Sequence, residues 1–371
     1  MCRIVLYAII NRLSECRGQA KLAHDRAWRL TKGCGSIPFA FVFLSFLYSC
    51  SPIDSKSSET DHNIASPKII GFKINESKKI EFIFSKEVIA TSSSFEINPP
   101  IGEISCEAKD NSIVINLSEE QAAGEEYFIK GRVKDKSGNS LSFSTKFYGF
   151  NPRVPGILIN EFTTNGSTAH PDLVELFITT DGNMAGVVYY AGCGCINDHE
   201  LIFPSFEVVK GEYIVIHTKP QGIPEEINET GAKDVSKGID ATANARDFWV
   251  KGGTGLSGNN GALALFSSPG GSLLDAVLYS NRTTSSDEKY RGFGSTNMLH
   301  KADCIAEKNG WFFDGESISP EDCIDPTQST ATRSICRNSK SDDTNTKNDW
   351  HVVPTSGYTF GRINSDAVYT P

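Results

Sequence analysis

Hydrophobic and polar residues alternate along several short runs between residues 67 and 150. Residues 79–84 and 112–117, for example, carry apolar side chains at every second position, a pattern typical of strands with one buried face. Turn residues separate the runs, and no long helical period is present in this region. The pattern predicts an antiparallel β-sandwich in this part of the chain.

The last turn of this region contains Asp135, Gly138 and Asn139 in the order D-x-x-G-N-x-L. This order resembles a turn of bacterial immunoglobulin-like (Ig-like) domains of the S-layer or cell-wall type. The resemblance implies an Ig-like domain over residues 67–150, in which these residues shape the hairpin before the last strand and Gly138 adopts a positive φ. The alternative, a calcium loop, would need more oxygen ligands than Asp135 and Asn139 provide.

A second set of strand patterns begins at Gly156, after a stiff, proline-containing linker formed by residues 151–155. Two long, polar, glycine-rich insertions interrupt this set, at residues 220–258 and 281–328. Loops of this length are either functional or disordered, so we expect any activity particular to this protein to lie there. The apolar runs themselves lie at residues 157–162, 172–178, 207–216, 258–266 and 271–279.

Several short motifs follow one another in this second region. I-N-E ends at Glu161, E-L begins at Glu175, L-x-D-x-V-x-Y contains Asp275, and R-S-x-x-R begins at Arg333, before Trp350. Their order resembles that of the lamin-tail domain, an Ig-type β-sandwich of nuclear lamins and of many exported bacterial proteins. The resemblance implies a lamin-tail-like domain over residues 156–365, in which Arg333 pairs with an acid near the end of the domain. It also implies structural roles for Asn160, Glu161, Glu175, Asp275, Arg333 and Trp350.

The apolar run at residues 37–49 ends at Cys50 and gives way to a polar segment. It is shorter than the ~20 residues that a membrane-spanning helix needs, and its end resembles the lipobox of a bacterial lipoprotein signal peptide. The resemblance implies removal of residues 1–49 and attachment of lipid to the Cys50 sulfur. The alternative is an ordinary secretory signal that is cut elsewhere. We expect the true start near Leu30, with an over-extended lead-in before it, and a flexible tether at residues 50–66.

The net charge narrows the classes of partner. The part of the chain that follows Cys50 holds 29 basic and 43 acidic residues, a net charge of −14. A general nucleic-acid-binding protein needs a basic surface to displace the counterions of the phosphates, so nucleic acid is not an expected partner. The same charge argues against electrostatic attachment to anionic lipids.

Six cysteines follow Cys50, and an even number in an exported protein suggests disulfides. They are Cys106, Cys193, Cys195, Cys304, Cys323 and Cys336. We favour a bond between Cys304 and Cys323, in a loop-rich stretch. Cys193 and Cys195 could bind a soft metal ion, but no second pair completes a tetrahedral site, so we expect two half-cystines with different partners. They follow two tyrosines, at the place where lamin-tail domains usually have a G-W turn, and we expect the tyrosines and a disulfide to replace the tryptophan packing.

The sequence contains no H-E-x-x-H, no G-x-S-x-G, no phosphate loop and no dinucleotide fingerprint. Glu161 and Glu175 could share a proton as an acid–base pair, but we favour hydrogen-bonding roles at the ends of strands. His170 and His199 stand beside acids in the sequence and are interpreted as solvated loop residues. The aromatic residues of the insertions, Trp249 and Trp311 among them, could form a binding patch, although a small satellite core is the favoured interpretation.

These observations predict an all-β protein: two antiparallel Ig-like β-sandwiches in tandem, after a signal peptide and a flexible tether. We expect an exported protein, anchored through lipid in the cell envelope at the outer membrane, that acts as a non-catalytic binding, scaffolding or adhesion module. Its expected partners are the membrane, through the anchor, and a protein or glycan ligand that the sequence does not identify. No cofactor is expected. The alternatives are an envelope hydrolase, such as a nuclease, phosphoesterase or protease, and a structural protein that binds peptidoglycan or polysaccharide.

Overall fold

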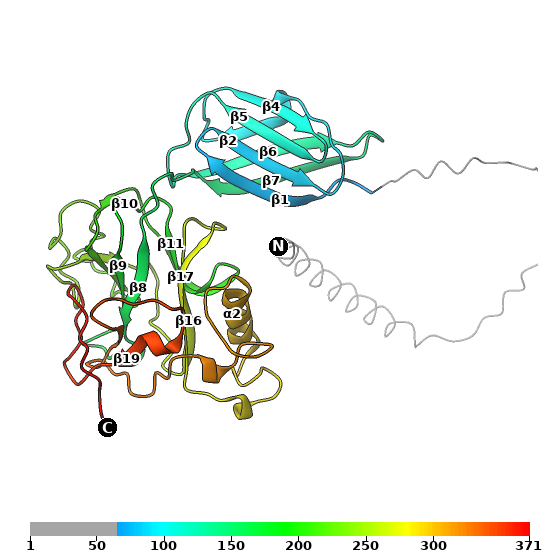
Figure 1. Ribbon diagram of the computed structural model, residues 1–371. Coiled ribbons are helices and arrows are strands. Elements are labelled where there is room, and N and C mark those ends of the chain that lie inside the picture. Colours follow the sequence, from blue (N-terminus) through cyan, green and yellow to red (C-terminus); the bar gives the residue numbers. More distant parts are fainter. Residues whose placement is uncertain (1–64) are drawn as a thin grey trace, which may run out of the picture.

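The computed structural model describes residues 65–371, and β-strands dominate this part of the chain (Figure 1). The expected all-β fold class is therefore confirmed. Cys50, the signal peptide at residues 1–49 and most of the tether lie outside the described residues, so the expectations for them stay predictions. Within residues 65–371, no helix is both long enough and apolar enough to cross a bilayer.

Seven antiparallel strands form the first sandwich, in two sheets with the strand orders β1-β2-β5-β4 and β3-β6-β7. In β6, Tyr127, Ile129 and Val133 are buried and the residues between them alternate in exposure, because successive strand residues point to opposite faces. The strands are β1 (Ile69–Glu76), β2 (Lys79–Phe84), β3 (Phe95–Asn98), β4 (Ile104–Lys109), β5 (Ser112–Leu117), β6 (Glu126–Lys134) and β7 (Ser140–Tyr148). The short helix η1 (Ser92–Ser94) precedes β3.

Aromatic rings fill the core of the first sandwich. The ring of Phe82 is fully buried and lies 4.7 Å from that of Phe72 and 4.9 Å from that of Phe143, measured between ring centroids. The turn between β6 and β7 has the expected form: Gly138 adopts a φ of 84°, and Asp135 accepts hydrogen bonds from the backbone N–H groups of Ser137 and Asn139. Asp135 also pairs with Lys86, so this carboxylate is fully engaged within the protein.

The second sandwich is larger and combines two sheets with the orders β12-β11-β16-β17 and β15-β14-β9-β8-β18-β19. All strand pairs are antiparallel except β14 with β15, which are parallel. The long strands are β8 (Ile157–Phe162), β9 (Leu173–Ile178), β11 (Val188–Cys193), β12 (Ile196–Ile202), β14 (Tyr213–His217), β15 (Arg246–Trp249), β16 (Asn260–Phe266) and β17 (Leu273–Ser280). The short ones are β10 (Gly182–Asn183), β13 (Glu207–Val208), β18 (Ile335–Arg337) and β19 (Trp350–Val352).

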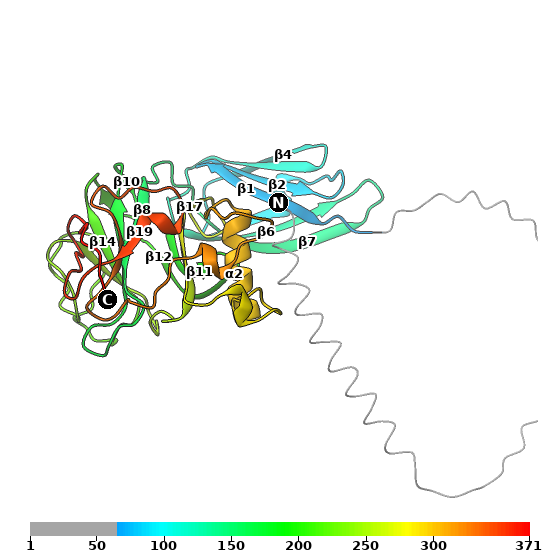
Figure 2. The ribbon, with the colours of Figure 1, turned by 60° about the horizontal axis from the view of Figure 1, so that its bottom comes forward.

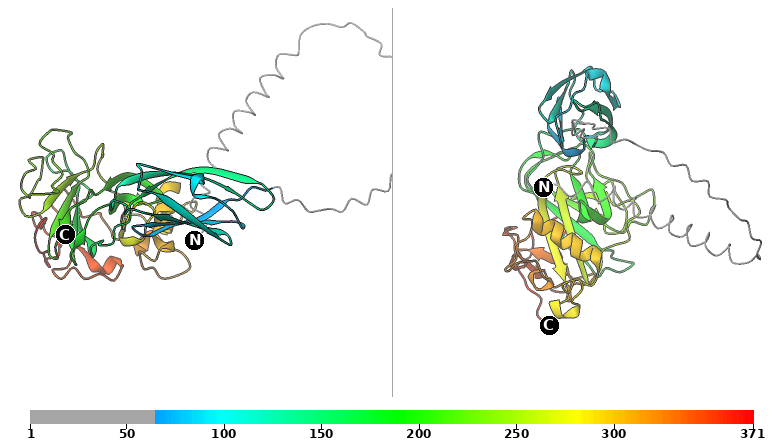
Figure 3. Two further views of the ribbon diagram at one scale, coloured as in Figure 1. Left: turned by 90° about the horizontal axis from the view of Figure 1, so that it is seen from above. Right: turned by 90° about the vertical axis from the view of Figure 1, so that its right-hand side faces the viewer.

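The insertion at residues 281–328 contains a helix that the sequence analysis did not predict, α2 (Thr296–Glu307). Ser295 caps its N-terminus by accepting a hydrogen bond from Met298 N, and Met298, Ala302 and Ile305 are buried on one face. The helix lies across the sheet that contains β11 and β16 (Figure 3, right). Three short 3-10 helices lie near it along the chain: η2 (Thr284–Ser286), η3 (Pro320–Asp322) and η4 (Lys347–Asp349).

Both insertions are folded against the second sandwich. Trp311 is 2% exposed and belongs to the main hydrophobic core, and its indole N–H donates to the Asp322 carbonyl at 3.0 Å. This tryptophan therefore extends the main core rather than forming a satellite of it. Phe312, in contrast, is 64% exposed.

The two sandwiches meet beside the expected linker at residues 151–155 (Figures 1 and 2). A Cβ atom added to Gly124 would stand only 2.4 Å from the backbone nitrogen of Gly186, so the two backbones approach closely there. Asn151 donates hydrogen bonds to the carbonyls of Asn183, at 2.7 Å, and Ala185, at 2.9 Å. The chain that leaves the first sandwich is thus fastened directly to the second.

The hydrophobic cores of the two sandwiches share no residue. We therefore expect Phe82→Ala to destabilise the first sandwich by about 3–5 kcal/mol, and Leu263→Ala to destabilise the second by about 2–5 kcal/mol. Urea unfolding followed by hydrogen exchange and mass spectrometry measures protection in each sandwich separately. Equal loss of protection in both sandwiches in either variant would show that they unfold as one unit.

Candidate functional site

Glu161 on β8 and Glu175 on β9 face each other across two neighbouring strands and are both fully buried. Glu161 accepts hydrogen bonds from the hydroxyls of Ser334 and Thr359 and from the backbone N–H of Thr359 at 2.8 Å. Glu175 accepts from the Asn160 amide at 2.8 Å and from the backbone N–H of Gly361 at 2.5 Å. The two carboxyl groups thus hold the C-terminal segment against the sheet.

Two asparagines complete this group, which we call the carboxylate cluster (Asn160, Glu161, Glu175 and Asn364). The Asn160 amide donates to the side-chain oxygen of Asn364 at 3.0 Å. The Asn364 amide donates in turn to the backbone carbonyls of Asn160 and Arg337, each at 3.0 Å. The neighbouring strands β8 and β9 are therefore joined by buried hydrogen bonds to β18 and to the C-terminal segment, both distant in the sequence.

Burial raises the pKa of both glutamates, because it removes water that would stabilise the charged carboxylate. The negative charge of Glu161 raises the pKa of Glu175 further, while the hydrogen bonds that each residue accepts lower its pKa. The folded protein therefore retains protons here at a pH at which exposed glutamates have lost them. Since the cluster is closed to solvent, its geometry favours the hydrogen-bonding role over acid–base chemistry on a ligand.

A second buried polar group is centred on Arg337. Its other members are Asp275, Asp343, Asp349 and Trp350. The guanidinium of Arg337 is fully buried, lies 4.6 Å from the ring centroid of Trp350, and donates to the Ile159 carbonyl at 2.8 Å. Asp343 accepts from it at 3.0 Å, and Asp275 and Asp349 lie 3.5 Å from it. Burial raises the pKa of Asp275 to about 7, and the charge of Arg337 acts in the opposite direction.

The expectation that Arg333 pairs with an acid is wrong, because Arg337 takes that role. Arg333 precedes β18, and its guanidinium lies 4.1 Å from the ring centroid of Tyr369. Arg337 is the last residue of β18 and reaches Ile159 on the adjacent strand β8. The motif R-S-x-x-R holds both arginines, and only the position of the strand distinguishes their roles.

The cysteines also require a correction. Cys304 on α2 is bonded to Cys193 at the end of β11, and not to Cys323 as expected. Cys195, in the turn between β11 and β12, is exposed and unbonded, so the expectation that both members of this pair are half-cystines is also wrong. The unpredicted helix is the reason, because it carries Cys304 to the tip of the hairpin. Cys106, Cys323 and Cys336 are free, and the last two are buried.

A buried contact between the side chains of His217 and Asp247 was not predicted. Their side chains meet at 2.8 Å, and the imidazole stacks on the Trp249 ring with centroids 3.7 Å apart. Nearby, Glu229 accepts hydrogen bonds from the backbone N–H groups of Val235, Ser236 and Asp247. These contacts fold the insertion at residues 220–258. His217 and Asp247 are 30 positions apart in the sequence, and no motif connects them by which the pair could have been recognised.

The two histidines that stand beside acids in the sequence find other partners. His170 lies 2.9 Å from Asp240, which is distant in the sequence, and His199 lies 3.0 Å from the Thr254 hydroxyl. The contact of His170 joins two loops of the second sandwich. The contact of His199, which lies on strand β12 and not in a loop as expected, joins that strand to the loop that contains Thr254. Neither histidine is a member of a three-residue group that could hold a metal ion within residues 65–371, where such a group consists of Cys193, Cys195 and Cys304.

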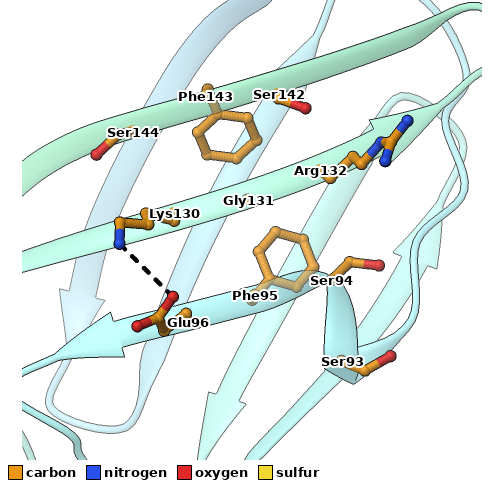
Figure 4. A pocket seen from close by; sticks show the side chains of 10 residues that line it. All are labelled: Ser93, Ser94, Phe95, Glu96, Lys130, Gly131, Arg132, Ser142, Phe143 and Ser144. Atoms are coloured by element: carbon orange, nitrogen blue, oxygen red, sulfur yellow. Dashed lines mark ion pairs between the residues drawn. The ribbon is translucent and has the colours of Figure 1, made fainter.

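Figure 4 shows a hollow of ≈ 470 Å³ on the sheet β3-β6-β7 of the first sandwich. Side chains of three adjacent strands and of η1 line it, among them the rings of Phe95 and Phe143. Lys130 and Glu96 form an ion pair at 3.7 Å, and Arg132, Ser142 and Ser144 lie along the same strands. The hollow is open and offers charged and hydroxyl groups to a ligand.

A smaller polar hollow of ≈ 240 Å³ lies between the loops that follow β8, β14 and β15. Asp172 lines it and accepts hydrogen bonds from Gly166 N at 2.6 Å and Leu256 N at 2.9 Å. Burial raises the pKa of Asp172, while these bonds and the charge of Lys219 lower it. The carboxylate therefore fastens two loops to each other.

Residues 155–352, more than half of the chain, match the family described as the TP_1001 protein second domain. The chain belongs to this family. An uncharacterized protein of Treponema pallidum (strain Nichols) is 29% identical over 158 residues, which are 43% of this chain and 40% of that protein. The matched part thus spans less than half of the relative's length.

Solved structures resemble the chain only weakly. The N-terminal part of the bacterial S-layer protein SbsC has a TM-score of 0.22 and 14% identity, over 31% of this chain and 41% of that one. Dimeric latent PorU from Porphyromonas gingivalis has a TM-score of 0.18 and 12% identity, over 60% of this chain and 20% of that one. Similarity at this level gives no basis for a function.

The ion pairs of Arg337 generate a stability prediction for this family's domain. Arg337→Met removes the charge that faces Asp275 and leaves a buried carboxylate without its partner, so we expect a loss of about 3–5 kcal/mol. The matched control, Arg333→Met, removes only a contact with an aromatic ring, and we expect a loss of about 1 kcal/mol or less. Chemical denaturation measures both values. Equal losses in the two variants would contradict the central role of Arg337.

The carboxylate cluster generates a pH prediction. A glutamate whose pKa is raised in the folded state stabilises the protein below about pH 4.3, its unfolded pKa, and this contribution is lost as the pH rises through the folded pKa. We therefore expect Glu175→Gln to flatten the decline in the free energy of unfolding above that pH, by up to about 1.4 kcal/mol per pH unit. The control, Glu200→Gln, changes an exposed residue of β12 and should leave the slope unchanged. Denaturant titrations over a pH series measure the slopes, and unchanged slopes in Glu175→Gln would refute the prediction.

Proposed function

We propose that this protein is an exported, lipid-anchored protein of the cell envelope, in which the two sandwiches form a non-catalytic binding or scaffolding module. The apolar run that ends at Cys50 supports the anchor, and the lamin-tail and Ig-like resemblances support the module. The main observation in support of the non-catalytic role is that the carboxylate cluster is closed to solvent. Glu161 and Glu175, the acids best placed for proton transfer, are fully buried and accept hydrogen bonds from the C-terminal segment.

The outer face of the sheet β3-β6-β7 is the surface that we propose for the ligand. Lys130 and Arg132 are exposed there, and Phe128 on the same strand is 44% exposed. Positive side chains on a chain that is acidic as a whole favour a partner with acidic groups. An exposed ring adds a flat apolar surface on which a sugar or a side chain can lie. An acidic glycan or an acidic protein of the envelope fits this combination.

Intact-mass analysis of the membrane-extracted protein tests the anchor. We expect the wild type to carry the mass of the attached lipid, and Cys50→Ser to lack that mass and to leave the membrane fraction. Cys106→Ser, a change at a partly buried cysteine of the first sandwich, is the control and should remain lipidated. A soluble, unlipidated wild-type protein would refute the anchor.

The same protein tests the binding function. We expect it to bind isolated cell-wall sacculi or an acidic polysaccharide, and Arg132→Glu to weaken that binding severalfold. The control, Lys73→Glu, reverses the charge of an exposed residue on the opposite sheet and should have little effect. Equal weakening in both variants would refute the proposed surface. Metal-dependent hydrolysis of envelope material by the purified protein would refute the non-catalytic assignment.

A further inference from the structure

Three sulfur atoms meet where α2 packs against the hairpin β11–β12. Cys193 lies at the end of β11, Cys195 lies in the two-residue turn that follows, and Cys304 lies on α2. Cys193 and Cys304 are bonded, and the Cys195 sulfur lies 3.0 Å from the Cys304 sulfur. Each of the three sulfurs lies within 4.8 Å of the other two. Cys195 is therefore placed beside a disulfide to which it does not belong.

With the disulfide formed, these three cysteines are suited to thiol–disulfide exchange and not to metal binding. A soft metal ion at this place would need three thiolates, but the disulfide takes two of the three sulfurs. The remaining thiol has the one partner that thiol–disulfide exchange requires, a disulfide sulfur in contact with it.

The three cysteines differ in their access to solvent. Cys193 is fully buried and Cys304 is 7% exposed, whereas Cys195 is exposed. Cys323 and Cys336, which are also free, are buried away from this hairpin. Among the free cysteines of residues 65–371, Cys195 thus combines access to solvent with contact to a disulfide.

We propose that Cys193, Cys195 and Cys304 form a thiol–disulfide exchange site in which Cys304 is bonded either to Cys193 or to Cys195. We call these two pairings the two registers of the disulfide. The Cys195 thiolate attacks the Cys304 sulfur, a Cys195–Cys304 bond forms, the Cys193–Cys304 bond breaks, and Cys193 leaves as a thiolate. The proton given up by Cys195 is taken up by Cys193 through solvent. One disulfide and one thiol are present before and after the step, so no oxidant or reductant is needed. This inference does not depend on the proposed binding function.

The two registers differ in whether a partner can reach the free thiol. In the register of the structure, an exposed Cys195 thiol can attack the disulfide of a small molecule or of another polypeptide, form a mixed disulfide with one half of it and release the other half as a thiolate. In the other register the free thiol is Cys193, which the core covers. Helix α2 stays bonded to the hairpin in both. The cluster can therefore expose or withdraw a thiol without releasing the helix.

The groups around Cys195 determine the rate of the exchange, because they shift the pKa of its thiol. The residue is exposed as a whole, but partial burial of its sulfur raises the pKa of the thiol. The nearby Glu307 acts in the same direction, and Lys308 acts against them. Because the thiolate is the attacking species, the exchange is slow near neutral pH and faster in mildly alkaline solution. The registers can thus be equilibrated at alkaline pH and then trapped by acid.

Disulfide mapping of the full-length protein, produced in an oxidising compartment, tests the proposal. The protein is equilibrated at mildly alkaline pH, quenched with acid, unfolded and alkylated with a maleimide, and the labelled cysteines are identified by tandem mass spectrometry. We expect the label of the wild type to divide between Cys195 and Cys193. A label on Cys195 with none on Cys193 would overturn the proposal.

Two serine variants make the test independent of that division. We expect Cys193→Ser to retain a disulfide, now between Cys195 and Cys304, and Cys195→Ser to leave no free thiol in the cluster. Cys323→Ser removes a buried thiol outside the cluster and should divide the label between Cys195 and Cys193 as the wild type does. A folded Cys193→Ser in which Cys195 and Cys304 are both alkylated would overturn the two registers. Should that variant fail to fold, the wild type and Cys195→Ser decide the outcome.

Discussion

The second sandwich depends on the burial of one positive charge, the guanidinium of Arg337. Removing an arginine from water costs several kcal/mol unless its N–H groups find acceptors. Here the acceptors come from both sheets, because Asp275 lies on β17 and the Ile159 carbonyl lies on β8. Asp343 and Asp349 add charge from the segment before β19. One side chain therefore fixes the spacing of the two sheets and the path of the chain that closes them.

The carboxylate cluster extends this constraint toward the C-terminus. Asn364 joins the two polar groups, since its amide donates both to the Arg337 carbonyl and to the Asn160 carbonyl. Glu161 and Glu175 then hold the backbone of the residues just before Asn364. A buried polar network of this kind is stable only when each member finds its partner, so its parts depend on one another. Glu161 and Glu175, which the sequence offered as an acid–base pair, therefore help to close the sandwich.

Sequence patterns predicted the strands and turns whose form depends on residues close together in the chain. The alternation in residues 79–84 and 112–117 marks strands, and Gly138 stands in a turn that needs a positive φ. Contacts between distant residues left no comparable signal. The spacing of Met298, Ala302 and Ile305 is a helical signal that was missed, but it does not indicate that α2 brings Cys304 to Cys193. Nothing in the sequence linked His217 to Asp247. Within R-S-x-x-R, the choice between Arg333 and Arg337 depends on where β18 begins, and strand boundaries are the least certain part of a sequence interpretation.

The two long insertions are held against the second sandwich by different contacts. Glu229 accepts three backbone N–H groups in the first insertion, and the second is held by a disulfide and by the buried indole of Trp311. These contacts engage polar groups of the insertions within the protein. Exposed polar groups lie on the outer face of the sheet β3-β6-β7 and at the hairpin tip that carries Cys195. The proposed binding surface and the proposed exchange site therefore lie on strands and in a tight turn, where little conformational entropy would be lost on binding.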